Sequence, residues 1–200
     1  MSSLVAKPAP DFTCAAVLPN GEIAENFRLS TAIKGKYAAL VFYPLDFTFV
    51  CPSELIALDH RVEALKERNV EVIAISIDSQ FTHAAWRKTA VDAGGIGAVR
   101  YTMAADVKHE IAKAYGVEHA DGVALRGTFV IDRQGIVRVG VVHDLPIGRD
   151  MDELIRVVDA IQFNEKHGEV CPAGWKKGDA GMKADAAGVA SYLAQHSKSL

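Results

Sequence analysis

Three cysteines are the residues of this 200-residue chain best suited to chemistry, and two of them lie in matching tripeptides. Cys51 lies in Val-Cys-Pro at positions 50–52, and Cys171 lies in Val-Cys-Pro at positions 170–172. Cysteine thiolates are nucleophiles, and two thiols can be joined by oxidation. The repeated tripeptide therefore indicates a reaction between two thiols that are far apart in the sequence. Cys14 has no such context, and we expect a buried strand residue there.

The surroundings of Cys51 predict that it is the nucleophile. It follows an apolar, strand-like run at 37–43 and precedes apolar residues at helical spacing, from Leu55 to Leu65. Proline is tolerated in a first helical turn, so we expect Cys51 at a helix N-terminus, where unpaired amides and the helix dipole favour a thiolate. Cys171 follows a long amphipathic helix and precedes a Gly/Lys-rich stretch at 172–178 that is typical of a mobile segment. It is the expected partner thiol.

Composition limits the classes of function. Half of the residues are apolar and the formal net charge is −3, which favours one substantial core and gives little attraction to nucleic acid or an anionic membrane. Residues 1–7 lack the apolar region of a secretory signal, and no apolar run approaches the roughly 20 residues that span a bilayer. We therefore expect a cytoplasmic protein, in which paired cysteines are catalytic or redox-sensing rather than structural.

The elements that must position these thiols follow an α/β order. An opening hairpin is expected from Pro8 to Gly21, then the strand at 37–43, the Cys51 helix, a buried strand at 70–77 and a helix at 81–91. A short helix at about 107–115 is expected next, then a hairpin of strands 127–131 and 136–142. A helix starting at Asp150 to Glu153 closes the domain at residue 166, and residues 167–200 form an arm with a weak helical pattern at 184–195.

Several longer motifs resemble one family. The run Phe-Tyr-Pro-Leu-Asp-Phe-Thr-Phe-Val-Cys-Pro-Ser-Glu at 42–54 resembles the active-site signature of typical 2-Cys peroxiredoxins of the alkyl hydroperoxide reductase C type. The segments 125–132, 144–149 and 168–175 are similar to the family's catalytic-arginine strand, a further loop and its resolving-cysteine segment. The resemblance covers residues 5–175 in the family's order. It implies a thioredoxin-like fold with a central mixed β-sheet flanked by helices, an N-terminal hairpin extension and a C-terminal arm.

The resemblance also assigns roles to residues. It implies that Cys51 is the peroxidatic cysteine, Cys171 the resolving cysteine and Arg126 the guanidinium that bonds both sulfur and peroxide. Thr48 is expected to place its hydroxyl between thiolate and peroxide, and Pro44 to shield the thiolate from water. The resemblance also implies a salt-bridge network in which the side chains of Glu54 and Arg149 orient Arg126.

The implied activity is that of an antioxidant peroxidase that reduces hydrogen peroxide and organic hydroperoxides. Cys51 becomes a sulfenic acid, condenses with Cys171 of another subunit, and is recycled by thioredoxin or by a flavoprotein disulfide reductase. The family cycle uses no metal, haem or flavin of the peroxidase itself, and the seven histidines show no metal-ligand spacing. A homodimer is implied, and from it a decamer.

Other functions make different demands on the sequence. A Cys-x5-Arg phosphatase would need arginine where the chain has Ala57, and a thioredoxin-type oxidoreductase would need Cys-x-x-Cys. A cysteine protease would pair the thiol with a distant histidine, which the sequence leaves open. The alternative from another class is a holdase chaperone or oligomeric scaffold, whose activity would survive Cys51→Ser.

Overall fold

A computed structural model describes residues 3–198 and divides the chain into two compact units after Met151. The first unit contains the sheet and the helices that flank it, and the second contains most of α6 and all of α7. The sequence-based division at residue 166 concerns the catalytic domain and its arm, and it stays a prediction.

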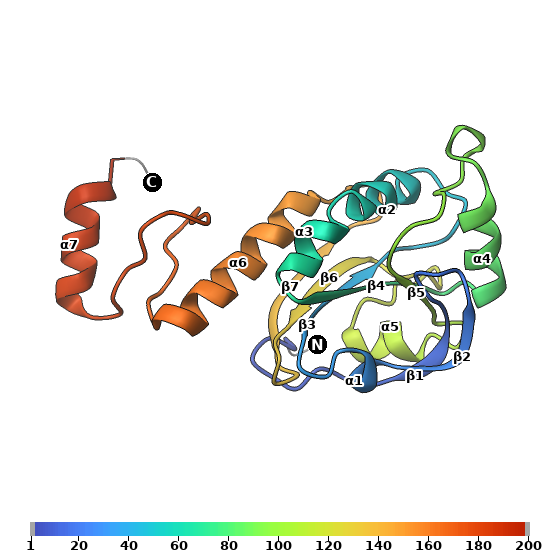
Figure 1. The fold of residues 1–200 in the computed structure, drawn as a ribbon, viewed down its shortest axis with the longest axis horizontal. Coiled ribbons are helices and arrows are strands. Elements are labelled where there is room, and N and C mark those ends of the chain that lie inside the picture. Colours follow the sequence, from blue (N-terminus) through green and yellow to red (C-terminus); the bar gives the residue numbers. More distant parts are fainter. Residues whose placement is uncertain (1–2, 199–200) are drawn as a thin grey trace. The chain divides into compact units, whose positions relative to one another are not determined.

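The elements follow one another in the order that Figure 1 shows by colour. The first unit consists of β1 (Thr13–Val17), β2 (Ile23–Arg28), α1 (Leu29–Ala32), β3 (Tyr37–Phe42), α2 (Cys51–Asp59), α3 (Val62–Glu67), β4 (Val70–Ser76), α4 (Gln80–Lys88), a 3-10 turn (Val91–Ala93), β5 (Thr102–Ala105), α5 (Glu110–Tyr115), β6 (Arg126–Ile131) and β7 (Val137–His143). Beyond them lie α6 (Met151–His167) and α7 (Ala186–His196).

The seven strands form one mixed sheet in the order β2-β1-β5-β4-β3-β6-β7. β4 pairs in parallel with β3 and β5, and the other pairs are antiparallel. β3 is buried along its whole length, as a central strand covered on both faces must be. The α/β class and the mixed sheet flanked by helices are therefore confirmed.

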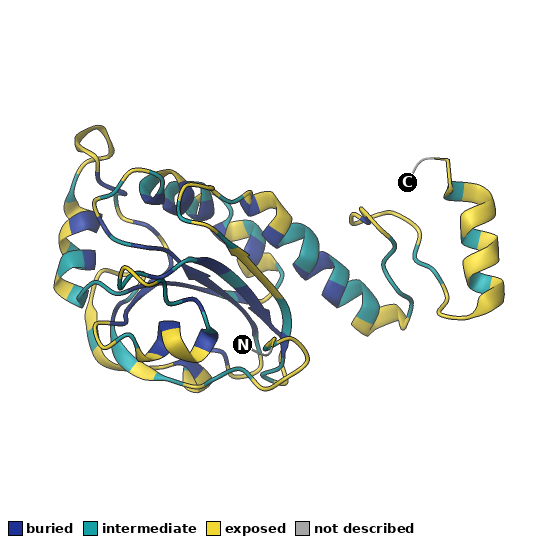
Figure 2. Cartoon of the chain, turned by 180° about the vertical axis from the view of Figure 1, so that it is seen from behind, coloured by how far each residue is buried: buried dark blue, intermediate teal, exposed yellow. Residues whose placement is uncertain are grey.

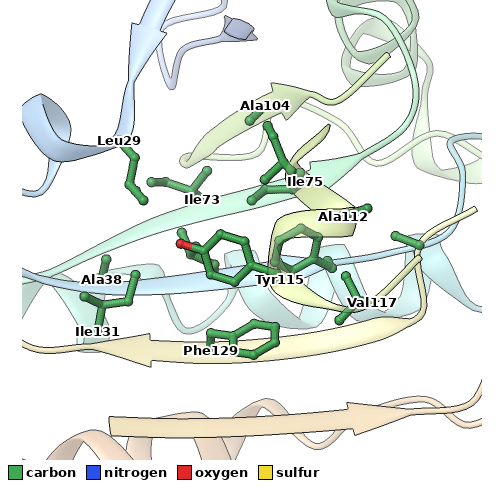
Figure 3. Close-up of a cluster of buried hydrophobic side chains, with 14 of the residues drawn as sticks. Leu29, Ala38, Ile73, Ile75, Ala104, Ala112, Tyr115, Val117, Phe129 and Ile131 are labelled. Atoms are coloured by element: carbon green, nitrogen blue, oxygen red, sulfur yellow. The ribbon is translucent and has the colours of Figure 1, made fainter. Parts of the chain in front are cut away.

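One face of the sheet carries a continuous apolar cluster beneath α1 and α5. Alternate residues of β3, β4 and β6 point into it, and Figure 3 shows the ring of Tyr115 lying beside that of Phe129. These two ring centroids are 5.1 Å apart at an interplanar angle of 65°, an edge-on contact that aromatic pairs prefer. The other residues of each strand face the opposite side, where α2 and α3 lie (Figure 1).

Burial follows the two strand faces and the helix stripes in Figure 2. The apolar residues that predicted one helical face after Cys51, namely Leu55, Leu58, Val62 and Leu65, are all buried. They belong to two helices, because α2 ends at Asp59 and α3 begins only at Val62. The expected single helix is wrong in that detail, although its buried face is right.

Three further expectations need correction. The N-terminal hairpin exists, but its second strand, β2, follows Gly21, which has a φ of +88° in the turn. The helix predicted to end at Val91 ends at Lys88, where Thr89 is already extended. The short helix predicted from about residue 107 begins at Glu110. In its first turn the amides of Ile111 and Ala112 donate hydrogen bonds to the Asp106 carboxylate.

The sequence does not predict β5. It has only four residues, two of them alanine, and it is defined by pairing with β4 on one side and β1 on the other. The weak helical pattern at 184–195 is confirmed as α7, whose first turn is capped by Asp185. Within residues 3–198, no helix has the length and hydropathy needed to cross a bilayer.

Candidate active site

Cys51 is the first residue of α2, as the sequence predicts. β3 ends at Phe42, residues 43–50 form a loop that we call the Cys51 loop, and the helix begins directly at the cysteine. The residue is only 1% exposed. Proline follows it within the first turn, and the N-cap residue, Val50, contributes no side-chain cap. The positive end of the helix is therefore directed at a thiol that is almost completely covered.

Arg126 reaches this thiol from the neighbouring part of the sheet. It is the first residue of β6, it is 3% exposed, and its Nη1 lies 3.5 Å from the Sγ of Cys51. The same nitrogen donates to Glu54 Oε2 at 2.7 Å, and Nε donates to the Leu145 carbonyl at 2.8 Å. The guanidinium is thus fixed at both ends, with a donor directed at the sulfur.

Glu54 connects Arg126 to Arg149. Arg149 Nε donates to Oε1 at 2.9 Å, its Nη2 donates to Oε2 at 3.0 Å, and its backbone amide donates to Oε1 at 2.8 Å. The side chains of all three residues are at most 4% exposed. Burial opposes ionisation of Glu54, but the hydrogen bonds and charge of Arg149, with the charge of Arg126, hold the pKa of this carboxyl below its ordinary value.

The Cys51 loop carries the two remaining site residues expected from the sequence. Pro44 is buried, and Thr48 Oγ1 donates to the Leu45 carbonyl at 2.8 Å. In this arrangement the Thr48 oxygen can still accept a hydrogen bond. To donate to a peroxide as well, its proton would have to leave Leu45. The roles of Pro44 and Thr48 stay predictions.

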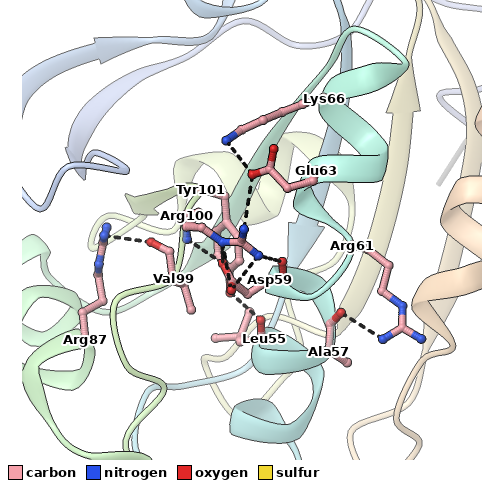
Figure 4. Close-up of polar contacts among 10 residues, drawn as sticks. All are labelled: Leu55, Ala57, Asp59, Arg61, Glu63, Lys66, Arg87, Val99, Arg100 and Tyr101. Carbon is pink, nitrogen blue, oxygen red and sulfur yellow. Dashed lines mark hydrogen bonds and ion pairs between the residues drawn. The ribbon is translucent and has the colours of Figure 1, made fainter.

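The far end of α2 is fixed to the segment before β5, as Figure 4 shows. Tyr101 donates its hydroxyl to the Leu55 carbonyl at 2.9 Å. Arg100 donates Nη2 to the Asp59 carbonyl at 2.6 Å and Nη1 to Glu63 at 3.2 Å, joining the ends of α2 and α3. The helix that begins at Cys51 is therefore held from its middle to its last residue.

The other two cysteines have different surroundings. Cys14, in β1, is half-buried, and burial raises the pKa of its thiol to about 11. Cys171 belongs to the second unit, where its thiol donates to the Ala160 carbonyl at 3.4 Å. Burial raises the pKa of this thiol, while the charge of Arg156 acts in the opposite direction. Neither cysteine lies at the start of a helix, as Cys51 does.

Sequence reasoning missed several groups at the site. The Leu145 carbonyl and the Gly127 carbonyl, which accepts from Arg149 Nη1 at 2.9 Å, are backbone atoms and leave no signal in residue types. Tyr43 and Asp46 lie within the resembling run itself, and His83 is one of the seven histidines, which show no metal-ligand spacing. Among residues 3–198, no group of three or more His, Cys, Asp or Glu side chains is arranged to hold a metal ion.

The arrangement suits attack by a sulfur anion on an atom that is bonded to an oxygen able to leave as an anion. A helix N-terminus and a fixed guanidinium supply positive potential at the sulfur, and the same charges can stabilise an oxygen that leaves as an anion. Four of the seven predicted site residues, Cys51, Arg126, Glu54 and Arg149, are in one contact network.

Comparison with known proteins identifies the family of the chain. Residues 5–139 match the AhpC/TSA family, and residues 160–195 match the C-terminal domain of 1-Cys peroxiredoxin. Alkyl hydroperoxide reductase C of Helicobacter pylori (strain ATCC 700392 / 26695) is 52% identical over 194 residues, which cover 97% of this chain and 98% of that protein. Peroxiredoxin-1 of Gallus gallus is 50% identical over 184 residues, 92% of each chain.

A solved structure extends the agreement to the fold. The reduced 2-Cys peroxiredoxin of Plasmodium vivax superposes with a TM-score of 0.94 at 48% identity, covering 96% of this chain and 100% of that one. Family models, relatives and fold thus agree along nearly the whole length. The chain belongs to the AhpC/TSA family and is a peroxidase of the peroxiredoxin type.

Proposed function

We propose that this peroxidase reduces hydrogen peroxide and small organic hydroperoxides with Cys51 as the attacking residue and Cys171 as the resolving one. The observation that carries the proposal is the contact of Arg126 Nη1 with the Cys51 sulfur, within a buried frame made by Glu54 and Arg149. The groups needed to favour a thiolate and to bind a peroxide are thus held together before any substrate arrives.

The first step is displacement at oxygen. The Cys51 thiolate attacks one oxygen of R–O–O–H, an S–O bond forms as the O–O bond breaks, and the other oxygen leaves as RO⁻. Protonation of RO⁻ gives an alcohol, or water when the substrate is hydrogen peroxide. Cys51 is left as a sulfenic acid, oxidised by two electrons. Arg126 stabilises charge on the departing oxygen, and Thr48 and Pro44 line the approach.

The second step forms a disulfide. The Cys171 thiol of another subunit attacks the sulfenic sulfur, and water leaves as the S–S bond forms. Because Cys51 is 1% exposed, the start of α2 or the Cys51 loop must open before this attack. The minimal unit is then a homodimer, which we expect to assemble into a decamer. Thioredoxin or a flavoprotein disulfide reductase supplies two electrons by thiol exchange.

Stopped-flow mixing with hydrogen peroxide tests this assignment, with products separated on non-reducing gels. Wild type should consume one equivalent rapidly and form a disulfide-linked dimer. Cys51→Ser should do neither, and Cys171→Ser should be oxidised at the wild-type rate without forming the dimer. Cys14→Ser is the matched control and should behave as wild type. Retained peroxidase activity in Cys51→Ser would refute the assignment.

The reductant is identified by a second experiment. Oxidised protein is mixed with NADPH and either thioredoxin with its reductase or a flavoprotein disulfide reductase, and NADPH consumption is followed under continuous peroxide. The productive reductant should sustain turnover that needs both Cys51 and Cys171. Turnover that persists in Cys171→Ser would exclude the intersubunit disulfide from the cycle.

A further inference from the structure

Cys171, the resolving residue of the proposed mechanism, lies against one stripe of α6. Its thiol donates to the Ala160 carbonyl at 3.4 Å, and the Trp175 carbonyl, four residues later, accepts from Arg156 Nη1 at 2.9 Å. Arg156 and Ala160 are themselves four residues apart, and residues at this spacing lie one above the other on a helix. Two contacts on one helix stripe therefore hold the segment 171–175.

Further contacts fix the chain on each side of Cys171. Val170 exchanges two backbone hydrogen bonds with Met182, at 2.9 and 3.0 Å. Trp175 is 3% exposed, and its ring centroid lies 4.8 Å from that of Phe163 in α6. The cysteine thus lies between two anchored neighbours, so its surroundings in the reduced protein are defined.

Glu153 determines the orientation of Arg156. Arg156 Nε donates to Glu153 Oε2 at 2.6 Å, and Nη2 donates to Oε1 at 2.7 Å. This two-point contact occupies one edge of the guanidinium and leaves Nη1 for the Trp175 carbonyl. The hydrogen bonds and charge of Glu153, with the charge of Cys171, raise the pKa of Arg156, although burial opposes them. The guanidinium is therefore charged wherever a thiol titrates.

The charge of Arg156 acts on the Cys171 thiol. Burial raises the pKa of this thiol, and the charge of Arg156 lowers it. The Arg156 side chain is 30% exposed, so solvent screens part of this effect. Arg156 therefore favours the thiolate of Cys171 against the influence of burial.

Other ionisable groups lie in the neighbouring turns of α6 and in the segment that follows it. Asp159 pairs with Lys177 at 3.9 Å, and His167 is the last residue of the helix. Glu169 lines a cavity with three ionisable side chains at or near α7, namely Lys183, Asp185 and His196. Among all these groups, the guanidinium of Arg156 is the charge that lowers the pKa of the resolving thiol.

Ionisation of Cys171 changes its contact with α6. The thiol donates to the Ala160 carbonyl, but a thiolate has no proton to donate, and the carbonyl oxygen then opposes its charge. The thiolate is also the form that attacks another sulfur. Loss of the proton therefore makes Cys171 nucleophilic and removes its hydrogen bond to the helix at the same time.

We propose that Arg156 is a positioning residue for the resolving step, which holds the segment 171–175 on α6 through the Trp175 carbonyl and brings a permanent positive charge to Cys171. The Cys171 thiolate attacks the sulfenic sulfur of Cys51, and the S–S bond forms as the S–O bond breaks. The departing hydroxide takes up the proton that Cys171 released. The inference rests on the proposed function, because that function assigns the second step to Cys171.

Four substitutions separate the charge from its structural contacts. Arg156→Gln removes the charge and keeps a side chain that can donate, whereas Arg156→Lys keeps the charge and loses the planar fork. Glu153→Gln removes the negative charge that opposes Arg156. The matched control is Lys177→Gln, which deletes a cation of the same segment whose side chain is 70% exposed.

The first measurement uses the reduced proteins without peroxide. Each is alkylated with iodoacetamide across a range of pH, and mass spectrometry gives the rate at Cys171 separately from the rates at the other cysteines. The midpoint of the Cys171 profile should rise by about half a unit in Arg156→Gln, because the thiolate loses a nearby opposite charge. It should fall in Glu153→Gln, lie near wild type in Arg156→Lys, and match wild type in Lys177→Gln.

The second measurement isolates the resolving step. One equivalent of hydrogen peroxide oxidises Cys51, samples are quenched in acid at set times, and the disulfide-linked dimer is quantified on non-reducing gels relative to Cys51 oxidation. At neutral pH, Arg156→Gln should form the dimer about threefold more slowly than wild type, because half a pKa unit is about threefold in thiolate. The difference should vanish in alkali, where both proteins carry the thiolate, and Arg156→Lys should restore most of the neutral rate.

The outcomes distinguish this inference from the proposed function. An alkylation profile of Cys171 that Arg156→Gln leaves in place would overturn the inference. An unchanged dimer rate would do the same, and so would a dimer rate slowed by one factor at every pH, which is the mark of structural loss alone. If wild type oxidises Cys51 but forms no dimer, the proposed function fails, whatever the alkylation profile of Cys171.

Discussion

Arg149 binds both carboxylate oxygens of Glu54, with Nε 2.9 Å from Oε1 and Nη2 3.0 Å from Oε2. This two-point contact fixes the plane of the carboxylate, and Oε2 then accepts from Arg126 Nη1 at 2.7 Å. Glu54 therefore acts as a spacer between two like charges that would otherwise repel. It also determines where the nitrogen that faces the Cys51 sulfur is placed.

Glu54→Gln is expected to slow peroxide attack and destabilise the fold. The amide keeps the size of the side chain but removes the buried negative charge between two guanidinium groups. Breaking a buried ion pair costs about 3–5 kcal/mol, and we expect the free energy of unfolding in urea to fall by about that amount. Because Arg126 is then free to turn, single-turnover oxidation of Cys51 should slow about 10- to 100-fold.

Glu63→Gln is the control for this change. Glu63 pairs with Arg100 and Lys66 on the surface, with a side chain that is 61% exposed. Surface pairs contribute about 0–1 kcal/mol, so its loss should alter stability little and leave the oxidation rate unchanged. Equal effects of the two substitutions would show that the buried Glu54 network contributes no more to stability and to the oxidation rate than a surface ion pair does.

The depressed pKa of Glu54 predicts a specific acid dependence. A carboxyl whose pKa is lower in the folded protein than in the unfolded chain stabilises the fold above the unfolded value, here 4.5, and loses that contribution as pH falls through the folded value. The stability difference between wild type and Glu54→Gln should be constant near neutrality and shrink below pH 4.5. Urea unfolding of both proteins from pH 7 downward measures it, and a difference that grows in acid contradicts the argument.

Charge alone should not replace Arg126. In Arg126→Lys, one ammonium cannot donate to Glu54, to the Leu145 carbonyl and to the sulfur in the directions that the planar guanidinium provides. We expect Cys51 oxidation to slow about 10- to 100-fold in Arg126→Lys and about 100- to 1000-fold in Arg126→Ala. Stopped-flow fluorescence measures both. A lysine variant at the wild-type rate would show that only the charge matters.

The sequence predicted the site where chemistry restricts residue types. A nucleophilic thiol at a helix start is readable from Cys51 and its neighbours, whereas the roles of Arg126 and Glu54 come from the resemblance of longer motifs to a known family. The sheet was equally readable from its buried strands, because long apolar runs such as the one at 70–77 have few alternatives.

What was missed depends on tertiary contacts. β5 is a strand because β4 and β1 flank it, and its four residues alone do not favour that conformation. His83 resembles any helical histidine in the sequence, and its place in the structure follows from burial against Asp46, 37 positions away. The break between α2 and α3 likewise falls within an apolar pattern that continues at helical spacing, and no glycine or proline marks it.

Two arginines in the region of Figure 4 should differ sharply in their contributions to stability. Arg87 is 7% exposed and donates to the carbonyls of Leu18, Pro19 and Val99 at 2.6–2.9 Å. Its replacement by alanine leaves these three carbonyl oxygens without their donor, and we expect the free energy of unfolding to fall by about 2–4 kcal/mol. Arg100 has a side chain that is 45% exposed, and Arg100→Ala should cost about 1 kcal/mol or less.

Thermal and urea unfolding of the two variants test this contrast. The total charge changes equally in both, so any difference between them reflects burial and hydrogen bonding rather than net charge. Similar losses in both variants would mean that the surface network around Asp59 stabilises the fold far more than its exposure suggests.

Cys14 should make the protein sensitive to alkali. Its thiol has a pKa of about 11 in the fold and 9.0 when unperturbed, so the unfolded chain ionises first as pH rises. An acidic group whose pKa is raised in the fold contributes its full stabilisation below the unfolded pKa. That stabilisation is lost between the unfolded and the folded pKa, by about 1.4 kcal/mol at pH 10.

Cys14→Val, which keeps an apolar side chain of similar size and cannot ionise, should therefore lose less stability than wild type between pH 8 and pH 10. Urea midpoints at both pH values measure the difference, with Cys171→Val as the control for a less buried thiol. If wild type and Cys14→Val lose stability in parallel, the Cys14 thiol is not withheld from ionisation by the fold.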